Sequence, residues 1–251
     1  MKKLKNMLLP FTAVVFSAAA LYLRRQLYAV ALDGKGLLLT GHPLETALWA
    51  VVLGGALLFI LAASRLGGTN LYEDNFHPSL LAFCSNAFLS ATVMTMALNH
   101  VLPLSEKVNL AWRVLGFLTA PGLLWVSICR SMGKKPFFGV HGALSVFLLL
   151  HLISRYQLWS GNPQLQDYVF ELLAFVALIL FSYHCTAFEA DMGSRRMQLA
   201  TGLLTILLCG AAIPYSDFPN LYICGLIWAA TDLCCPFLPP KEVEVDSDEA
   251  S

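Results

Sequence analysis

Charged residues are scarce in this chain, and several absences narrow its possible functions before any helix is placed. Only 13% of the 251 residues are charged and the formal net charge is zero, so no basic surplus attracts nucleic acid. The sequence holds no CxxC pair, no HExxH, no GxSxG, no Walker loop and no Rossmann glycine pattern. We therefore expect no nucleic-acid partner and assign no catalytic residue, and a non-enzymatic protein is favoured over an enzyme.

Apolar residues are abundant instead. They make up 57% of the chain, and the mean hydropathy is +0.66. About twenty apolar residues in a helix cross the roughly 30 Å core of a bilayer. The pattern predicts an all-α, polytopic integral membrane bundle of about eight transmembrane helices with short loops, forming one domain over residues 1–238. The predicted spans are roughly 7–29, 43–64, 79–100, 109–130, 137–157, 167–188, 197–214 and 219–238. Residues 239–251 are predicted to form a disordered acidic cytoplasmic tail.

The distribution of basic residues predicts the orientation. With the N-terminus inside, ten of the 16 Lys and Arg residues fall on the cytoplasmic side and six on the outer side. Because basic residues favour the cytoplasmic side, both termini are expected there. The MKKLK start favours a bacterial cytoplasmic membrane. It also resembles a signal peptide, although the apolar run continues past Ala18–Ala20 and favours an uncleaved first span, with cleavage left open.

Ionisable residues in the outer third of the spans form the leading candidate site. They are Arg24, Arg25, Glu45, His100, Arg113, His151, Arg155 and Glu171. Four arginines and two glutamates give a net charge of +2 with neutral histidines, which suits a small anionic solute or a lipid headgroup. The residues expected to bind it in an outward-facing polar pocket are Arg113, His151, Arg155, Glu171, His100 and Arg24. The alternative is a set of interhelical ion pairs that orient the bundle.

A second group lies towards the cytoplasmic ends of the spans. Its candidate residues are His141, His184, Glu189 and Asp232. Glu189 can pair with Arg195 or Arg196 across the turn that follows its span. Asp232 stands in an otherwise apolar stretch, so it either accepts a hydrogen bond from a neighbouring helix or carries a proton in coupled transport.

The histidines allow a different function. His141 and His151 are ten residues apart, which is about 15 Å along a helix and about 80° around it, so they cannot share one metal ion. Pairs at two depths, His141 with His184 and His100 with His151, would suit a membrane protein of the b-type haem class. No metal site and no cofactor are expected otherwise. A third alternative is a scaffold, sensor or assembly factor, whose protein partner the sequence does not identify.

Overall fold

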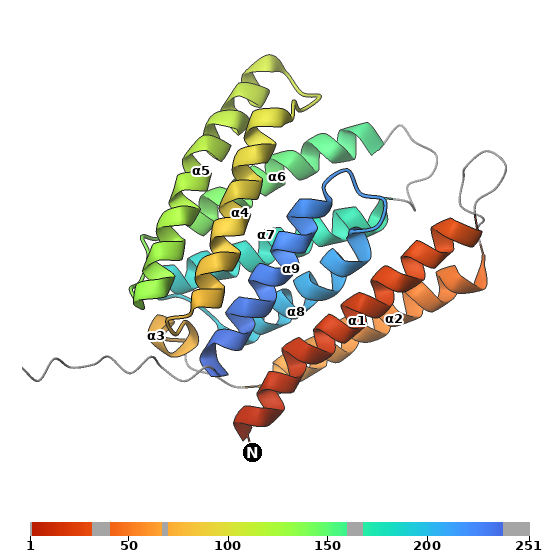
Figure 1. Ribbon diagram of the computed structural model, residues 1–251, viewed down its shortest axis with the longest axis horizontal. Helices are drawn as coiled ribbons and strands as arrows, with labels where there is room; N and C mark the ends of the chain where they lie inside the picture. The colour runs from red at the N-terminus through yellow and green to blue at the C-terminus, as the bar shows by residue number, and fades with distance from the viewer. Residues whose placement is uncertain (1, 32–40, 67–69, 160–167, 238–251) are drawn as a thin grey trace, which may run out of the picture.

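The computed structural model describes residues 2–31, 41–66, 70–159 and 168–237, and within them every regular element is a helix (Figure 1). The elements are α1 (Lys2–Val30), α2 (Pro43–Arg65), α3 (Tyr72–Asn75), α4 (Leu80–Asn99), α5 (Glu106–Met132), α6 (Val140–Trp159), α7 (Val169–Glu189), α8 (Arg195–Ala212), α9 (Pro219–Cys234) and the 3₁₀ turn η2 (Cys235–Phe237). The predicted all-helical bundle is confirmed, with one long helix at each predicted span. The predicted acidic tail lies outside the described residues.

Five of these helices are long and apolar enough to cross a membrane. They are α1 over Leu8–Val30, α2, α4, α5 and α7. The other long helices, α6, α8 and α9, do not meet the same standard of length and hydropathy within the described residues. In α8 the polar residues Arg195, Gln198 and Thr205, all of them buried, lower the mean hydropathy of the helix. The molecule is therefore a multi-pass membrane protein, with five helices in the described residues that are long and apolar enough to cross the bilayer.

The helices that follow α3 form a ring. Each of α4 to α9 contacts the next in the series, and α9 packs back against α4. The hairpin of α1 and α2 lies outside this ring and packs on α8, as the red and orange helices of Figure 1 show. As a result α8 has neighbours on several sides, and most of its residues are buried.

Local sequence explains where several helices begin and end. Pro43 occupies the first turn of α2, where its missing N–H is not needed, and the His42 Nδ1 accepts a hydrogen bond from the Leu44 N–H at 3.2 Å. Gly133 ends α5 with a φ of 69°, a left-handed conformation that glycine adopts without strain.

Small residues allow α1 and α8 to approach each other closely. A Cβ added at Gly210 would lie 1.8 Å from the Ser17 hydroxyl and 2.9 Å from the Ser17 carbonyl oxygen. The backbone oxygen cannot rotate away, so only glycine fits here, in the manner of small-residue contacts between membrane helices.

We predict that Gly210→Ala lowers the thermal unfolding midpoint of the protein in detergent, because α1 must move away from α8. The expected cost is about 1–3 kcal/mol, as for overpacking elsewhere. Gly54→Ala is the matched control, since a Cβ there has no atom within 4 Å, and it should leave the midpoint unchanged or slightly raised. Equal midpoints for the two variants would contradict the close α1–α8 contact.

Candidate functional site

Four charged side chains meet at one end of the bundle, and we call them the Glu171 cluster: Arg24 of α1, Arg155 of α6, Glu171 of α7, and Asp217 between α8 and α9. Glu171 is 1% exposed and interacts electrostatically with the other three. It accepts a hydrogen bond from the Tyr222 hydroxyl at 3.4 Å. Arg155 forms an ion pair with Asp217. With two arginines and two carboxylates, the cluster carries no net charge when its histidine neighbours are neutral.

Arg24 is buried and joins α1 to the ring. Its Nη1 donates a hydrogen bond of 2.7 Å to the carbonyl oxygen of Ala211 near the end of α8. Its guanidinium also lies 5.3 Å from the centre of the Phe170 ring. The last carbonyl groups of a helix have no N–H partner within the helix, so they attract hydrogen-bond donors and positive charge. Arg24 supplies both at the end of α8. Arg24 therefore holds the α1–α2 hairpin on the ring as well as facing Glu171.

His151 lies beside this cluster in an aromatic box. Its ring centroid is 5.7 Å from Trp112, 5.2 Å from Phe175 and 4.6 Å from Phe218. Both ring nitrogens are buried and have no hydrogen-bond partner among the described residues. Packing against these three rings therefore holds the imidazole in place. A small polar group could reach its two nitrogen atoms only if the rings moved apart.

His100 directly follows α4, and Arg113 of α5 reaches the end of α4 with its side chain. The His100 ring packs 4.6 Å from Phe218, and burial, followed by the charge of Arg155, lowers the pKa of this imidazole. Arg113 donates hydrogen bonds to the carbonyl oxygens of Ala97 at 3.0 Å and Leu98 at 2.8 Å. Those contacts satisfy the last turn of α4. Arg113 is thus engaged with a helix end and is not placed with Arg155 and Glu171.

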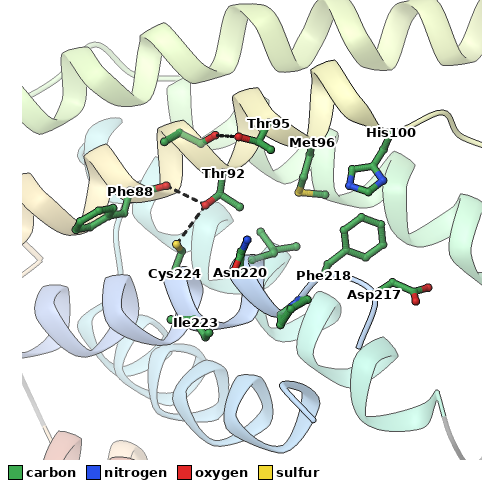
Figure 2. Close-up of a pocket in the computed structure, with 13 residues that line it drawn as sticks. Phe88, Thr92, Thr95, Met96, His100, Asp217, Phe218, Asn220, Ile223 and Cys224 are labelled. Carbon is green, nitrogen blue, oxygen red and sulfur yellow. Dashed lines mark hydrogen bonds between the residues drawn. The ribbon is translucent and has the colours of Figure 1, made fainter. Parts of the chain in front are cut away.

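A groove separates α4 from α9 next to the Glu171 cluster (Figure 2). Its volume is about 350 Å³. It is lined by Phe88, Ala91, Thr92, Thr95, Met96, His100, Asp217, Phe218, Pro219, Asn220, Leu221, Ile223 and Cys224. Of the outer candidates only His100 lines this α4–α9 groove, but Asp217 connects it to Arg155. Along the groove, between Phe88 and His100, the Thr92 hydroxyl and the Cys224 thiol lie 3.2 Å apart and join α4 to α9 (Figure 2).

The sequence does not single out Asp217, because it stands in the link between two predicted spans, where exposed acids are common. The signal that could have found it is the length of that link. Only Tyr215–Phe218 separate the predicted spans 197–214 and 219–238, so an acid there must stay close to the helix ends. Including Asp217 changes the expected net charge of the site, since it offsets Arg155.

A second group of charges lies at the opposite end, and we call it the Asp232 cluster: Arg130, His141, Glu189, Arg195 and Asp232. Arg130 and Asp232 form a buried ion pair, and the Arg130 guanidinium lies 4.3 Å from the centre of the Phe76 ring. Tyr72 of the short helix α3 interacts electrostatically with Arg130, and burial raises the pKa of its hydroxyl.

His141 and Glu189 form the other pair of the Asp232 cluster. Nδ1 of His141 lies 2.5 Å from Oε1 of Glu189, and both residues are buried. The His141 ring is stacked on Trp228 with a centroid distance of 5.4 Å and an angle of 3°. Arg195 donates to the side-chain oxygen of Gln198 at 2.8 Å. Glu189 is therefore engaged by a histidine of the preceding helix, and the structure gives it no direct bond to Arg195.

The histidine arrangement bears on the haem alternative. His100 and His151 contact the same phenyl ring, that of Phe218, and His141 is stacked on Trp228. His184 is half-buried and packs on the adjacent Tyr183. An iron between His100 and His151 would require the Phe218 ring, which contacts both, to move. Haem binding stays a prediction that an absorption spectrum can test.

Comparisons with known proteins give no identity. No protein-family model, no curated protein and no solved structure matches the chain. The candidate sites consequently depend on their own geometry.

We predict that Asp232→Asn destabilises the protein strongly, because the Arg130 charge loses its buried partner. Breaking such a pair costs about 3–5 kcal/mol, and the double variant Arg130→Gln/Asp232→Asn should recover part of it. Lys135→Gln is the control: it breaks an ion pair with Asp191 whose side chains are 34% and 67% exposed. Surface pairs contribute about 0–1 kcal/mol. Thermal unfolding midpoints in detergent that fall equally for the two single variants would contradict the importance of the buried pair.

Proposed function

We propose that the protein binds a small anionic solute with an apolar part, or an anionic lipid headgroup, in the α4–α9 groove. The observation that carries the proposal is the Arg155–Asp217 ion pair at the edge of that groove. The groove supplies an apolar wall for most of the ligand, and Arg155 supplies the positive charge. Its volume of about 350 Å³ lies within the range of small-molecule sites in proteins.

The two partners of this ion pair differ in exposure. The side chain of Arg155 is 13% exposed, whereas that of Asp217 is 64% exposed. Arg155 is also held against the Phe218 ring, 5.2 Å from its centre. The arginine is therefore the fixed partner and the aspartate the movable one. A carboxylate or phosphate from a ligand could replace the Asp217 carboxylate on Arg155, because a guanidinium pairs with either group.

Other groups at this end of the groove complete the site. His100 offers an imidazole, and Asn220 offers an amide that can donate to an anion or accept from a hydroxyl. The threonines and the apolar residues farther along would contact the rest of the ligand. The Glu171 cluster has no net charge while Asp217 is paired with Arg155. An anion is therefore attracted fully to Arg155 only when Asp217 moves away from it.

We further propose that the protein lies in the cell membrane with both termini in the cytoplasm. The support is the excess of ten basic residues over six on the two predicted sides. This orientation puts the Glu171 end of the bundle, and with it the α4–α9 groove, on the outer side. Passage of the ligand across the membrane is an extension of the proposal that would require α4 and α9 to separate where Thr92 meets Cys224.

We predict that hexyl phosphate raises the thermal unfolding midpoint of the purified protein, whereas hexyltrimethylammonium and hexanol do not. Arg155→Gln should abolish the effect, because it removes the fixed cation. Asp217→Asn should tighten binding by about tenfold, equivalent to about 1.4 kcal/mol, because no internal carboxylate competes. Intrinsic tryptophan fluorescence during heating is a suitable readout.

Arg25→Gln is the matched control for this experiment, since Arg25 is an exposed arginine of α1 next to Arg24. It should respond to hexyl phosphate like the unmodified protein. The proposal fails if Arg155→Gln and Arg25→Gln respond alike, or if all three hexyl compounds shift the midpoint equally, which would indicate partition of the alkyl chain only.

The orientation has its own test in a bacterial host. A green fluorescent protein fused after Ser251 should fluoresce, and alkaline phosphatase fused at the same position should be inactive, because the first matures in the cytoplasm and the second outside it. The opposite pair of results would contradict a cytoplasmic C-terminus.

A further inference from the structure

The α4–α9 groove is open on the outer surface of the helix ring. The exposed residues that line it are Phe88, Ala91, Thr95, Asp217, Asn220 and Ile223. Met96 and Leu221, which also line it, are buried and lie at its base. Because α4 is long and apolar enough to cross a membrane, its exposed face meets lipid. The groove therefore opens sideways into the bilayer.

The length of the groove matches the depth of one bilayer leaflet. Its α4 wall runs from Phe88, near the middle of the helix, to His100 just beyond the helix end, and these twelve steps along the chain span about 18 Å. Half of the hydrocarbon core of a bilayer is about 15 Å deep. A groove of this length, with a volume of about 350 Å³, accommodates one extended hydrocarbon chain.

The part of the groove nearest the middle of α4 is suited to a chain without polar groups. The Thr92 hydroxyl donates to the carbonyl oxygen of Phe88 at 2.9 Å, and the Thr95 hydroxyl donates to that of Ala91 at 2.8 Å (Figure 2). A hydroxyl has a single hydrogen, so neither threonine donates to a ligand while these bonds persist. This wall fits an alkyl chain better than it fits a sugar or a peptide.

The charged part of the groove lies at one end only. The Phe218 ring belongs to the groove wall, and it lies 5.2 Å from the Arg155 guanidinium and 4.6 Å from the His100 ring. Asp217, which also lines the groove, forms the ion pair with Arg155. A fixed cation therefore borders the same end at which the polar lining residues gather.

This end lies at the level of lipid headgroups. Arg155 is four residues before the end of α6, which is about 6 Å along the helix axis. The adjacent Tyr156 is exposed, as is typical of tyrosines at the membrane interface. The site thus has the polarity of an anionic lipid, with a cation at headgroup level and an apolar channel running towards the middle of the membrane.

The headgroup, and not the chain, decides which lipid is selected. A lipid chain fills an apolar groove that is open to the bilayer, because an empty groove would lose dispersion contacts. Lipid tails are as apolar as the groove wall, so this filling does not distinguish one lipid from another. An anionic headgroup gains the attraction of Arg155, whereas a choline headgroup brings a second cation beside it.

We propose that the ligand of the α4–α9 groove is an anionic membrane phospholipid that enters sideways from the bilayer. One acyl chain lies between α4 and α9, the phosphate lies on Arg155 in place of Asp217, and the second chain stays in the surrounding bilayer. This inference rests on the proposed function, since both depend on Arg155, and it narrows the ligand to a lipid.

The test counts the lipids that the purified, delipidated protein retains in native mass spectrometry. Dioleoyl phosphatidylglycerol is compared with dioleoyl phosphatidylcholine, which has the same chains. One phosphatidylglycerol per protein should be retained, with a preference of about tenfold over phosphatidylcholine, as for the gain of one charge-assisted contact. Arg155→Gln should remove this preference.

Two tryptophan variants test the position of the chain. Ile223 and Ile227 lie one turn apart on α9 and are each 40% exposed, but only Ile223 lines the groove. Ile223→Trp should fill the groove and lower the retention of phosphatidylglycerol about tenfold. Ile227→Trp is the matched control and should retain the lipid like the unmodified protein. Both positions are exposed, so both variants should fold, which the thermal unfolding midpoint checks.

Equal lipid retention in the two tryptophan variants would overturn the inference. If hexyl phosphate still stabilises the protein through Arg155 in that case, the proposed function stands and the ligand is a soluble anion. If neither hexyl phosphate nor phosphatidylglycerol depends on Arg155, the proposed function fails as well. A homodimer that Ile223→Trp dissociates would assign the groove to a second copy of the chain and would also overturn the inference.

Discussion

The need to neutralise charge away from water governs the arrangement of this protein. Each end of the bundle brings two arginines and two carboxylates together, and all of the arginines except the partly exposed Arg155 are buried. At one end these are Arg24 and Arg155 with Glu171 and Asp217; at the other they are Arg130 and Arg195 with Glu189 and Asp232. An uncompensated ion in such a place is costly, so the pairing sets which helices must be neighbours. Helices α6 and α7 contribute residues to both clusters and link the two ends.

Aromatic side chains fill the space between these clusters. Trp112 stacks on Phe147 at 4.8 Å, Phe175 packs against Tyr222 at 5.6 Å, and Phe181 against Trp228 at 4.7 Å. Large rings pack densely and hold neighbouring helices at fixed separations. Packed aromatic rings therefore separate the two charged ends of the bundle.

Most of the architecture could be predicted from the sequence, because hydropathy is a local property. The predicted span 43–64 corresponds to α2 at residues 43–65, and 79–100 corresponds to α4 at 80–99. The predicted span 219–238 corresponds to α9 at 219–234 together with the 3₁₀ turn η2 at 235–237. The ring of α4 to α9 could not be predicted, because the side of a helix that faces a given neighbour depends on contacts between residues far apart in the chain.

The sequence predicts the depth of the candidate site residues in the bundle, but not which side chains they contact. Glu171, Arg155, Arg24 and His151 do lie at one level. Arg113 shares that level, yet it bonds to the end of α4, because a long side chain reaches the nearest free carbonyl groups. Asp217 was missed because it lies outside the predicted spans. Which charged side chains pair with each other depends on differences of a few ångströms in their separation. The order of residues along the chain does not give the separation of side chains on different helices.

The central functional claim is that Arg155 exchanges the Asp217 carboxylate for an external anion at the α4–α9 groove. The most direct measurement is an experimental structure of the protein with hexyl phosphate bound. The account predicts the phosphate on Arg155, the alkyl chain between α4 and α9, and Asp217 turned away from the arginine. A ligand bound elsewhere, with the Arg155–Asp217 pair intact, would contradict it.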